Sequence, residues 1–175
     1  RTLPLAPYRG LFGVVLQDTA LFEESVKDNI SYGREEVPMP VIERAAQIAG
    51  ADGFIRRLPR GYDTVLTQGG NELSQGERQL LTIARAVLTD APILILDEAT
   101  SSVDTVTEQK IRRAMLTITE GRTSFIIAHR LTTIRDSDII ILIEGGKIAE
   151  QGTHRELMAQ NGKYATMFHT QMGEG

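Results

Sequence analysis

Two adjacent carboxylates, Asp97 and Glu98, follow an apolar run that has the character of a buried strand. Residues 93–96 are Ile-Leu-Ile-Leu, and such runs are typical of strands inside a parallel sheet that is covered on both faces. Ligands of these sheets bind beyond the carboxyl ends of the strands. Asp97 could therefore hold Mg²⁺, and Glu98 could orient or deprotonate an attacking water, which is the chemistry of phosphoryl transfer. The alternative is that the dipeptide only ends the strand and caps the next helix.

A second feature lies upstream, where Ser74-Gln75-Gly76-Glu77 precedes a helical pattern. The Ser-x-x-Glu spacing is that of a capping box, in which each side chain satisfies a backbone N–H at a helix start. A helix start can also hold a phosphate. Gly76 costs roughly 1 kcal/mol relative to alanine in a helix, and its missing side chain would let a phosphate approach the backbone. The segment is therefore either a plain helix start or a phosphate site.

A histidine, His129, follows a second apolar run at residues 123–128. It is predicted to emerge at the carboxyl end of a strand, as Asp97 and Glu98 do. A single histidine in such a place is usually a structural hydrogen-bonding residue. Two carboxylates on a neighbouring strand favour the functional interpretation.

The elements that must position these residues alternate in type along the chain. We expect strands at residues 11–16, 93–97, 123–128 and 139–143, and helices at about 41–49, 53–58, 107–117 and from Ser74 to a stop at Asp90 and Pro92. Gly145-Gly146 predicts a two-residue hairpin, and Thr153-x-x-Glu156 predicts a second capping box at the start of a terminal helix. This alternation favours a mixed α/β fold with a mostly parallel sheet and helices on both faces.

Composition sets outer limits on function. The 175 residues carry a net charge of −4 and no cysteine. A negative net charge does not favour nucleic-acid binding. Without cysteine, the chain has no disulfide and no thiolate metal site. The longest apolar runs, such as residues 139–143, are far shorter than the roughly 20 residues of a membrane span, and nothing resembles a signal peptide. Any association with a membrane would come through a partner domain.

Five motifs, taken in order, resemble those of the ATP-binding cassette (ABC) ATPases, and above all the nucleotide-binding domain of an ABC exporter. They are Gln17 within residues 14–18, Leu73 to Glu77, Ile93 to Glu98, Ser101 to Asp104, and Ile127 to Arg130. Flanking segments at 58–64 and 146–154 are similar too, so the resemblance covers essentially the whole chain. It implies a P-loop NTPase-like (RecA-like) fold in a single domain, residues 1–175, with a helical subdomain at about 18–90.

The resemblance implies catalytic and metal-binding roles around ATP. Asp97 is similar to the Walker B aspartate that holds Mg²⁺, Glu98 to the catalytic glutamate, and His129 to the switch histidine that contacts the γ-phosphate. Gln17 resembles the loop glutamine that contacts Mg²⁺ and the attacking water and senses the transport domain.

The resemblance also implies partners. Ser74, Gln75, Gly76 and Glu77 occupy the signature motif, which faces ATP held by an opposing subunit, and Asp104 is similar to the aspartate of the loop that bridges two subunits. The partners would be a second nucleotide-binding domain, identical or related, and a transmembrane domain on the same or a separate chain. The location would be the cytoplasmic face of a membrane, with no nucleic acid involved.

The sequence departs from the family pattern in three places. It contains no Gly-x-x-x-x-Gly-Lys-Ser/Thr loop, so we expect the N-terminal part that carries this Walker A loop and the preceding strands to be missing, and the chain alone to bind ATP poorly. Gln75 and Glu77 stand where the family has glycine and glutamine, and a negative charge at Glu77 could weaken ATP docking. Thr67-Gln68-Gly69-Gly70 replaces the usual Gly-Glu-x-Gly.

Two other interpretations are compatible with parts of the pattern. The chain could be a non-catalytic fragment that self-associates through an exposed sheet edge or supplies residues 74–77 in trans. It could also be an ABC ATPase of DNA repair. Members of that group carry a long coiled-coil insertion before the signature motif, and the short stretch 18–72 leaves no room for it.

Overall fold

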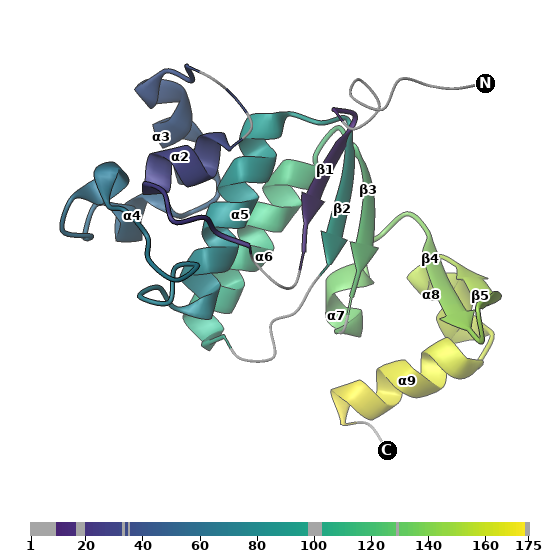
Figure 1. Ribbon diagram of the computed structural model, residues 1–175. Helices are drawn as coiled ribbons and strands as arrows, with labels where there is room; N and C mark the ends of the chain where they lie inside the picture. Colours follow the sequence, from purple (N-terminus) through teal and green to yellow (C-terminus); the bar gives the residue numbers. More distant parts are fainter. Residues whose placement is uncertain are drawn as a thin grey trace. The chain divides into compact units, whose positions relative to one another are not determined.

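The structure is a computed structural model that describes residues 10–16, 20–32, 34, 36–97, 103–128 and 130–173 (Figure 1). The chain forms two compact units that divide between Ile127 and Ala128. Each unit is described by itself below. The expected single domain of residues 1–175, with a helical subdomain at about 18–90, stays a prediction.

The strands that precede the predicted catalytic residues form a three-stranded parallel sheet. Strands β1 (Phe12–Val15), β2 (Ile93–Asp97) and β3 (Thr123–Ile127) lie in the order β1-β2-β3, with β2 in the middle. Parallel strands need crossover connections, and helix α6 (Thr105–Thr119) lies between β2 and β3 in the chain. The three strands expected in this part of the sequence are thus confirmed to within two residues at each end.

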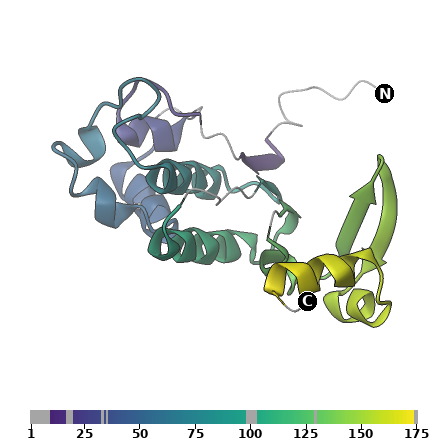
Figure 2. The ribbon, with the colours of Figure 1, turned by 90° about the horizontal axis from the view of Figure 1, so that it is seen from below.

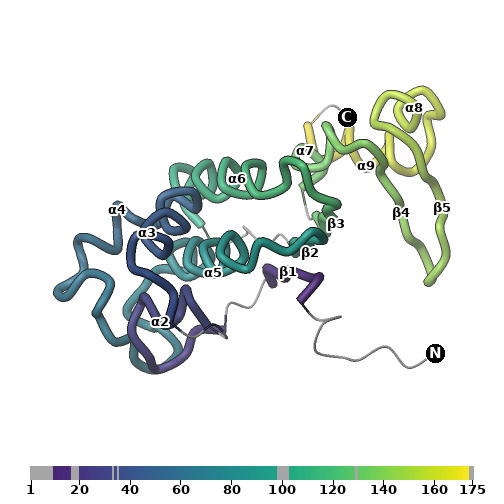
Figure 3. The backbone as a smooth tube through the Cα atoms, turned by 90° about the horizontal axis from the view of Figure 1, so that it is seen from above, coloured from purple at the N-terminus to yellow at the C-terminus, as the bar shows by residue number. Residues whose placement is uncertain are grey.

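Helix α5 (Gln75–Thr89) is the central helix of the first unit. It packs against α2 (Val26–Ser31), α3 (Met39–Ile48), α6 and β1. Figure 3 shows α5 and α6 running side by side, and Figure 1 shows both on one side of the sheet. The short helix α4 (Asp52–Ile55) and the 3₁₀ turn η1 (Gly61–Asp63) complete the unit.

Helix α2 is one element that the sequence pattern did not predict. Ser25 caps it and accepts a hydrogen bond from the Asp28 amide. This Ser-x-x-Asp spacing was the available signal, but six residues are too few for a clear helical period.

Among the described residues of the first unit, one face of the sheet is covered by helices. Leu94, Leu96 and Val15 are fully buried and belong to one core cluster with residues of α5 and α6. On the opposite face Ile95 is half-buried and Phe125 is 59 % exposed. The expectation that residues 93–96 are covered on both faces is therefore correct for one face, because α5 and α6 lie on the same side of the sheet.

The second unit is a β-hairpin packed on helices. It contains α7 (Leu131–Ile134), β4 (Ile140–Glu144), β5 (Lys147–Gly152), α8 (His154–Ala159) and α9 (Lys163–Met172), and Figure 2 shows the hairpin extending away from α8 and α9. Gly145 and Gly146 have φ of 57° and 75°, as a two-residue hairpin turn requires. Both bonds of the capping box at Thr153 are present, so the hairpin and this helix start are confirmed.

The predicted terminal helix is two helices. The helix is interrupted between α8 and α9, where Asn161 has φ of 49° and Gly162 follows. Across the part of the chain that the structure describes, no helix has the length and apolar character needed to cross a bilayer.

Candidate functional site

Three of the predicted site residues, Gln17, Glu98 and His129, lie outside the described residues. The strands that lead to them are described. Val15 pairs with Leu96, and Asp97 pairs with Ile127, so β1, β2 and β3 end at one edge of the sheet. Gln17, Glu98 and His129 each follow one of these strand ends within two residues.

Asp97 is the last residue of the central strand β2 and is half-buried. Among the described residues no cluster of three or more His, Cys, Asp or Glu side chains could hold a metal ion. A dedicated cluster is not required for Mg²⁺, which is usually bound by one or two carboxylates together with water and substrate phosphates. A single carboxylate at this sheet edge therefore fits the predicted Mg²⁺ ligand.

The start of α5 has the predicted capping box. The Ser74 Oγ atom accepts a hydrogen bond from the Glu77 amide at 3.2 Å, and the Glu77 carboxylate accepts one from the Ser74 amide at 3.0 Å. Ser74 is exposed at the end of the helix. The Glu77 carboxylate is thus folded back onto the first turn of α5, where the helix dipole stabilises its charge.

Gly76 packs against the neighbouring helix. The residue is buried, and a Cβ atom placed on it would lie 2.3 Å from Thr107 Cγ2 and 3.1 Å from Val103 Cγ1. A side chain at this position would overlap α6, and the interpretation that the glycine admits a phosphate to the backbone stays a prediction. The glycine lets the first turns of α5 and α6 pack closely together.

We expect Gly76→Ala to destabilise the chain although alanine is the better helix former. The gain of roughly 1 kcal/mol in helix propensity is opposed by overpacking of about 1–3 kcal/mol, since the new methyl group overlaps Thr107 Cγ2. The free energy of unfolding in urea measures the net loss. Adding Thr107→Ser removes Cγ2 but keeps the hydroxyl, and should restore most of the stability. Equal stability of the single and double variants would contradict this explanation.

Asp104 caps α6 beside the start of α5. Its carboxylate accepts hydrogen bonds from the amides of Val106, at 3.1 Å, and Thr107, at 3.0 Å. Hydrogen bonding from Thr107 holds the pKa of the exposed Asp104 below its usual value. The residues predicted to face a second subunit, Ser74 and Asp104, thus precede two helices whose first turns are in contact.

The lowered pKa of Asp104 predicts a pH-dependent stability. Because the pKa is below its ordinary 3.8 in the folded chain, ionised Asp104 adds stability that is fully present above that pH and is lost as the pH falls through the folded pKa. Asp104→Asn keeps the cap but has no charge. The difference in unfolding free energy between wild type and this variant should be fully present at about pH 6 and shrink as the pH falls below the ordinary pKa of aspartate and through the folded one. A pH-independent difference would exclude the charge as its cause.

The loop before the signature motif is held against α5. Gln68, Gly69 and Gly70 have φ of 45°, 69° and 80° in succession, and the Arg78 guanidinium donates to the carbonyl oxygens of Leu73, at 2.7 Å, and Gly70, at 3.4 Å. Gln68 replaces the glutamate of the Gly-Glu-x-Gly pattern. It is exposed, and it begins this turn of left-handed residues.

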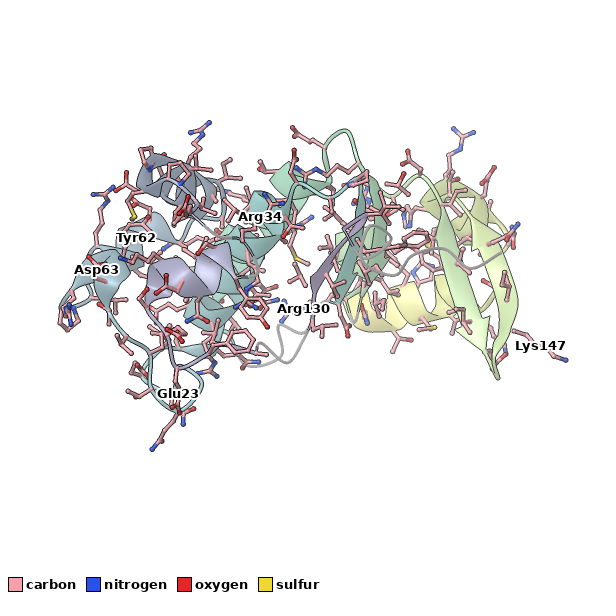
Figure 4. The ribbon with its side chains drawn as sticks, turned by 45° about the horizontal axis from the view of Figure 1, so that its top comes forward. Glu23, Arg34, Tyr62, Asp63, Arg130 and Lys147 are labelled. Atoms are coloured by element: carbon pink, nitrogen blue, oxygen red, sulfur yellow. The ribbon has the colours of Figure 1, made fainter. Side chains whose placement is uncertain are left out.

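A stacked aromatic pair, which the sequence did not single out, lies on the surface beside α2. The rings of Phe22 and Tyr32 stack 4.2 Å apart and are 36 % and 56 % exposed. They line a shallow cavity of about 300 Å³ together with Glu24, Asp28, Ser31 and Arg34. Arg34, labelled in Figure 4, also donates to the Thr89 carbonyl oxygen at the end of α5, at 2.6 Å. No local pattern signals this pair, because stacking joins residues ten positions apart.

Comparison with known proteins places the chain among transporters. Residues 4–101 match a family described as ABC transporter. The chain is 51 % identical over 171 residues to the uncharacterized ABC transporter ATP-binding protein YfiC of Bacillus subtilis, covering 98 % of this chain and 28 % of that protein. It is 52 % identical over 159 residues to a fatty acid ABC transporter ATP-binding/permease protein of Mycobacterium tuberculosis, covering 91 % of this chain and 25 % of that protein.

A solved structure is similar over almost the whole chain. It is a bacterial Atm1-family ABC exporter with ATP bound, with a TM-score of 0.86 and 43 % identity, covering 95 % of this chain and 29 % of that one. The mixed α/β fold predicted from the sequence is thus confirmed. The chain spans less than a third of the length of each of these three proteins.

Proposed function

Since the chain belongs to the ABC transporter family, we propose that it forms part of the ATP-binding and ATP-hydrolysing domain of a membrane exporter. One observation carries the proposal. The three paired parallel strands end at one sheet edge, and Gln17, Glu98 and His129 each follow one of these ends. Ligands of parallel sheets bind at this edge, so the edge can collect an amide, two carboxylates and an imidazole around one substrate.

Each residue has a separate task in this proposal. Asp97 holds Mg²⁺, which when bound neutralises charge that develops on the phosphates. Glu98 orients the attacking water and accepts its proton. His129 donates a hydrogen bond to the γ-phosphate, and Gln17 contacts the metal and the water.

Two copies, or this chain and a related one, would complete each ATP site. Ser74 and the backbone amides at the start of α5 supply hydrogen-bond donors and a positive helix dipole to a triphosphate held by the opposing domain. The exposure of Ser74 and the close packing of Gly76 on Thr107, in the helix that Asp104 caps, support this arrangement. Gln75 and Glu77 would make this half of the site less favourable for an anion than the usual glycine and glutamine.

A transmembrane domain is the second proposed partner, and it would place the chain at the cytoplasmic face of a membrane. The exposed Phe22–Tyr32 pair, which lines a shallow cavity, begins five residues after Gln17 in the sequence. Aromatic side chains with an exposed face are typical anchors of protein interfaces. We assign this surface, which we call the aromatic surface, to contact with the transmembrane partner.

The test is ATP hydrolysis by the natural polypeptide that carries residues 1–175, reconstituted in lipid vesicles. We expect hydrolysis that requires Mg²⁺, stops with a chelator and is lost in Asp97→Asn, whereas Asp138→Asn, a carboxylate in the second unit, serves as the matched control. Activity that survives chelation and the Asp97 change would contradict the proposal. Absence of any ATP-dependent activity would favour a non-catalytic interaction role instead.

A further inference from the structure

Arg85 occupies an unusual place on helix α5. The residue is half-buried, and no carboxylate among the described residues lies within ion-pair distance of it. Its guanidinium carbon lies 5.5 Å from the centroid of the Phe22 ring and 5.2 Å from that of Tyr32. Burial lowers the pKa of Arg85, so desolvation of the guanidinium has a cost that no ion pair with a described residue offsets.

The guanidinium joins two separate segments to α5. Its Nε atom donates to the Asn29 carbonyl oxygen at 2.9 Å, and its Nη1 atom donates to the Ala20 carbonyl oxygen at 3.1 Å. Ala20 lies three residues after Gln17 in the sequence. Two directed bonds in different directions need the planar fork of arginine, which lysine lacks.

Asn29 extends this connection to the aromatic surface. Its side chain is 1 % exposed, accepts from the Phe22 amide at 2.8 Å and donates to the Phe22 carbonyl oxygen at 3.0 Å. The Arg85 Nη2 atom lies 3.4 Å from the same Asn29 Oδ1 atom. Phe22 is thus fixed to α2, and α2 to α5, by polar contacts within one network.

We propose that Arg85 is a positioning residue that transmits displacement of the aromatic surface to the signature helix. The inference rests on the proposed function, since it specifies how a partner seated on Phe22 and Tyr32 would act on the ATP site. Arg85 lies on α5, and Ser74 caps the same helix, which can carry a displacement along its length as a rigid element. A shift of the Phe22 segment would therefore reach Ser74 through the guanidinium.

The experiment measures coupling in the natural polypeptide that carries residues 1–175. Arg85→Met keeps most of the side-chain stem but removes the charge and both directed bonds. We expect the ratio of transported-substrate-stimulated to unstimulated ATP hydrolysis to fall roughly tenfold. Arg85→Lys keeps the charge over the rings without the fork and should give an intermediate ratio.

Two controls separate positioning from general loss of stability. Arg57→Met removes an exposed arginine that bonds only the nearby Gly53 carbonyl oxygen, and should leave the ratio unchanged. Ile111→Val loosens the buried core of α6 without touching the network, and should lower the amount of folded protein but not the ratio. If Ile111→Val lowers the ratio as much as Arg85→Met, or if Arg85→Met leaves it unchanged, the inference is overturned.

A second measurement does not depend on ATP. In the 175-residue chain, hydrogen exchange at the Phe22 and Asn29 amides should be roughly tenfold faster in Arg85→Met, whereas amides within α6 should keep their rates. Unchanged exchange at both amides overturns the inference whatever the hydrolysis data show. Absence of hydrolysis in wild type would refute the proposed function and leave the exchange result to decide whether Arg85 joins these segments.

Discussion

Glu98→Gln should lower ATP hydrolysis by the natural polypeptide about a thousandfold while ATP binding persists. A positioned general base contributes roughly 10²–10⁴ to a rate, and the amide of glutamine cannot accept the proton of the attacking water. The substitution keeps the size and hydrogen-bonding reach of the side chain. A steady-state assay of phosphate release, combined with a binding assay that uses a fluorescent ATP analogue, measures the two effects separately.

Glu120→Gln is the matched control for this substitution. Glu120 is an exposed residue directly after α6, and the same change there should alter hydrolysis by less than about twofold. A Glu98→Gln variant that retained hydrolysis within about tenfold of wild type would remove Glu98 from the role of general base. Loss of ATP binding together with hydrolysis would instead point to a structural role.

Asn29→Ala is expected to destabilise the first unit strongly for a polar truncation, with a loss of about 2 kcal/mol in unfolding free energy. The amide side chain is buried and bonds the backbone at Phe22, Ser25 and, at 3.3 Å, Glu24. Alanine would remove the acceptor of the Phe22 amide and one of the donors to each of three carbonyl oxygens, which keep their backbone donors. Urea unfolding followed by far-ultraviolet circular dichroism measures the loss.

Asn71→Ala provides the comparison for Asn29→Ala. Asn71 is exposed, and its side chain makes one long hydrogen bond of 3.5 Å to Gln68, so the change should cost less than about 0.5 kcal/mol. Similar losses for the two variants would show that burial of the Asn29 amide is not what stabilises the α2 region.

Local patterns in the sequence predicted most of the elements that the structure contains. The apolar runs before Asp97 and Ala128 are strands, Ser74 and Thr153 begin helices through capping boxes, and Gly145-Gly146 forms the hairpin turn. These features depend on residues within a few positions of one another. The order of the motifs was sufficient to identify the family, whereas the roles of the individual site residues remain predictions.

The tertiary structure decided which distant residues meet. The sequence indicated only that Gly76 lacks a side chain, and the structure shows that Thr107 lies where that side chain would be. Arg85 bonds the carbonyl oxygens of Ala20 and Asn29, more than fifty residues away, and no local pattern indicates these contacts. Helix α2 and the one-sided burial of β2 were likewise outside what periodicity could indicate.

There is a physical reason why the sequence predicted the elements but not the contacts between them. Hydrophobic period, helix caps and turn glycines act through neighbouring backbone groups, so the sequence by itself determined the elements and their order. Packing of α5 on α6, and the placement of a desolvated guanidinium over two aromatic rings, depend on how those elements lie in space. No local pattern encodes such contacts, because their energy exists only once residues far apart in the chain have been brought together.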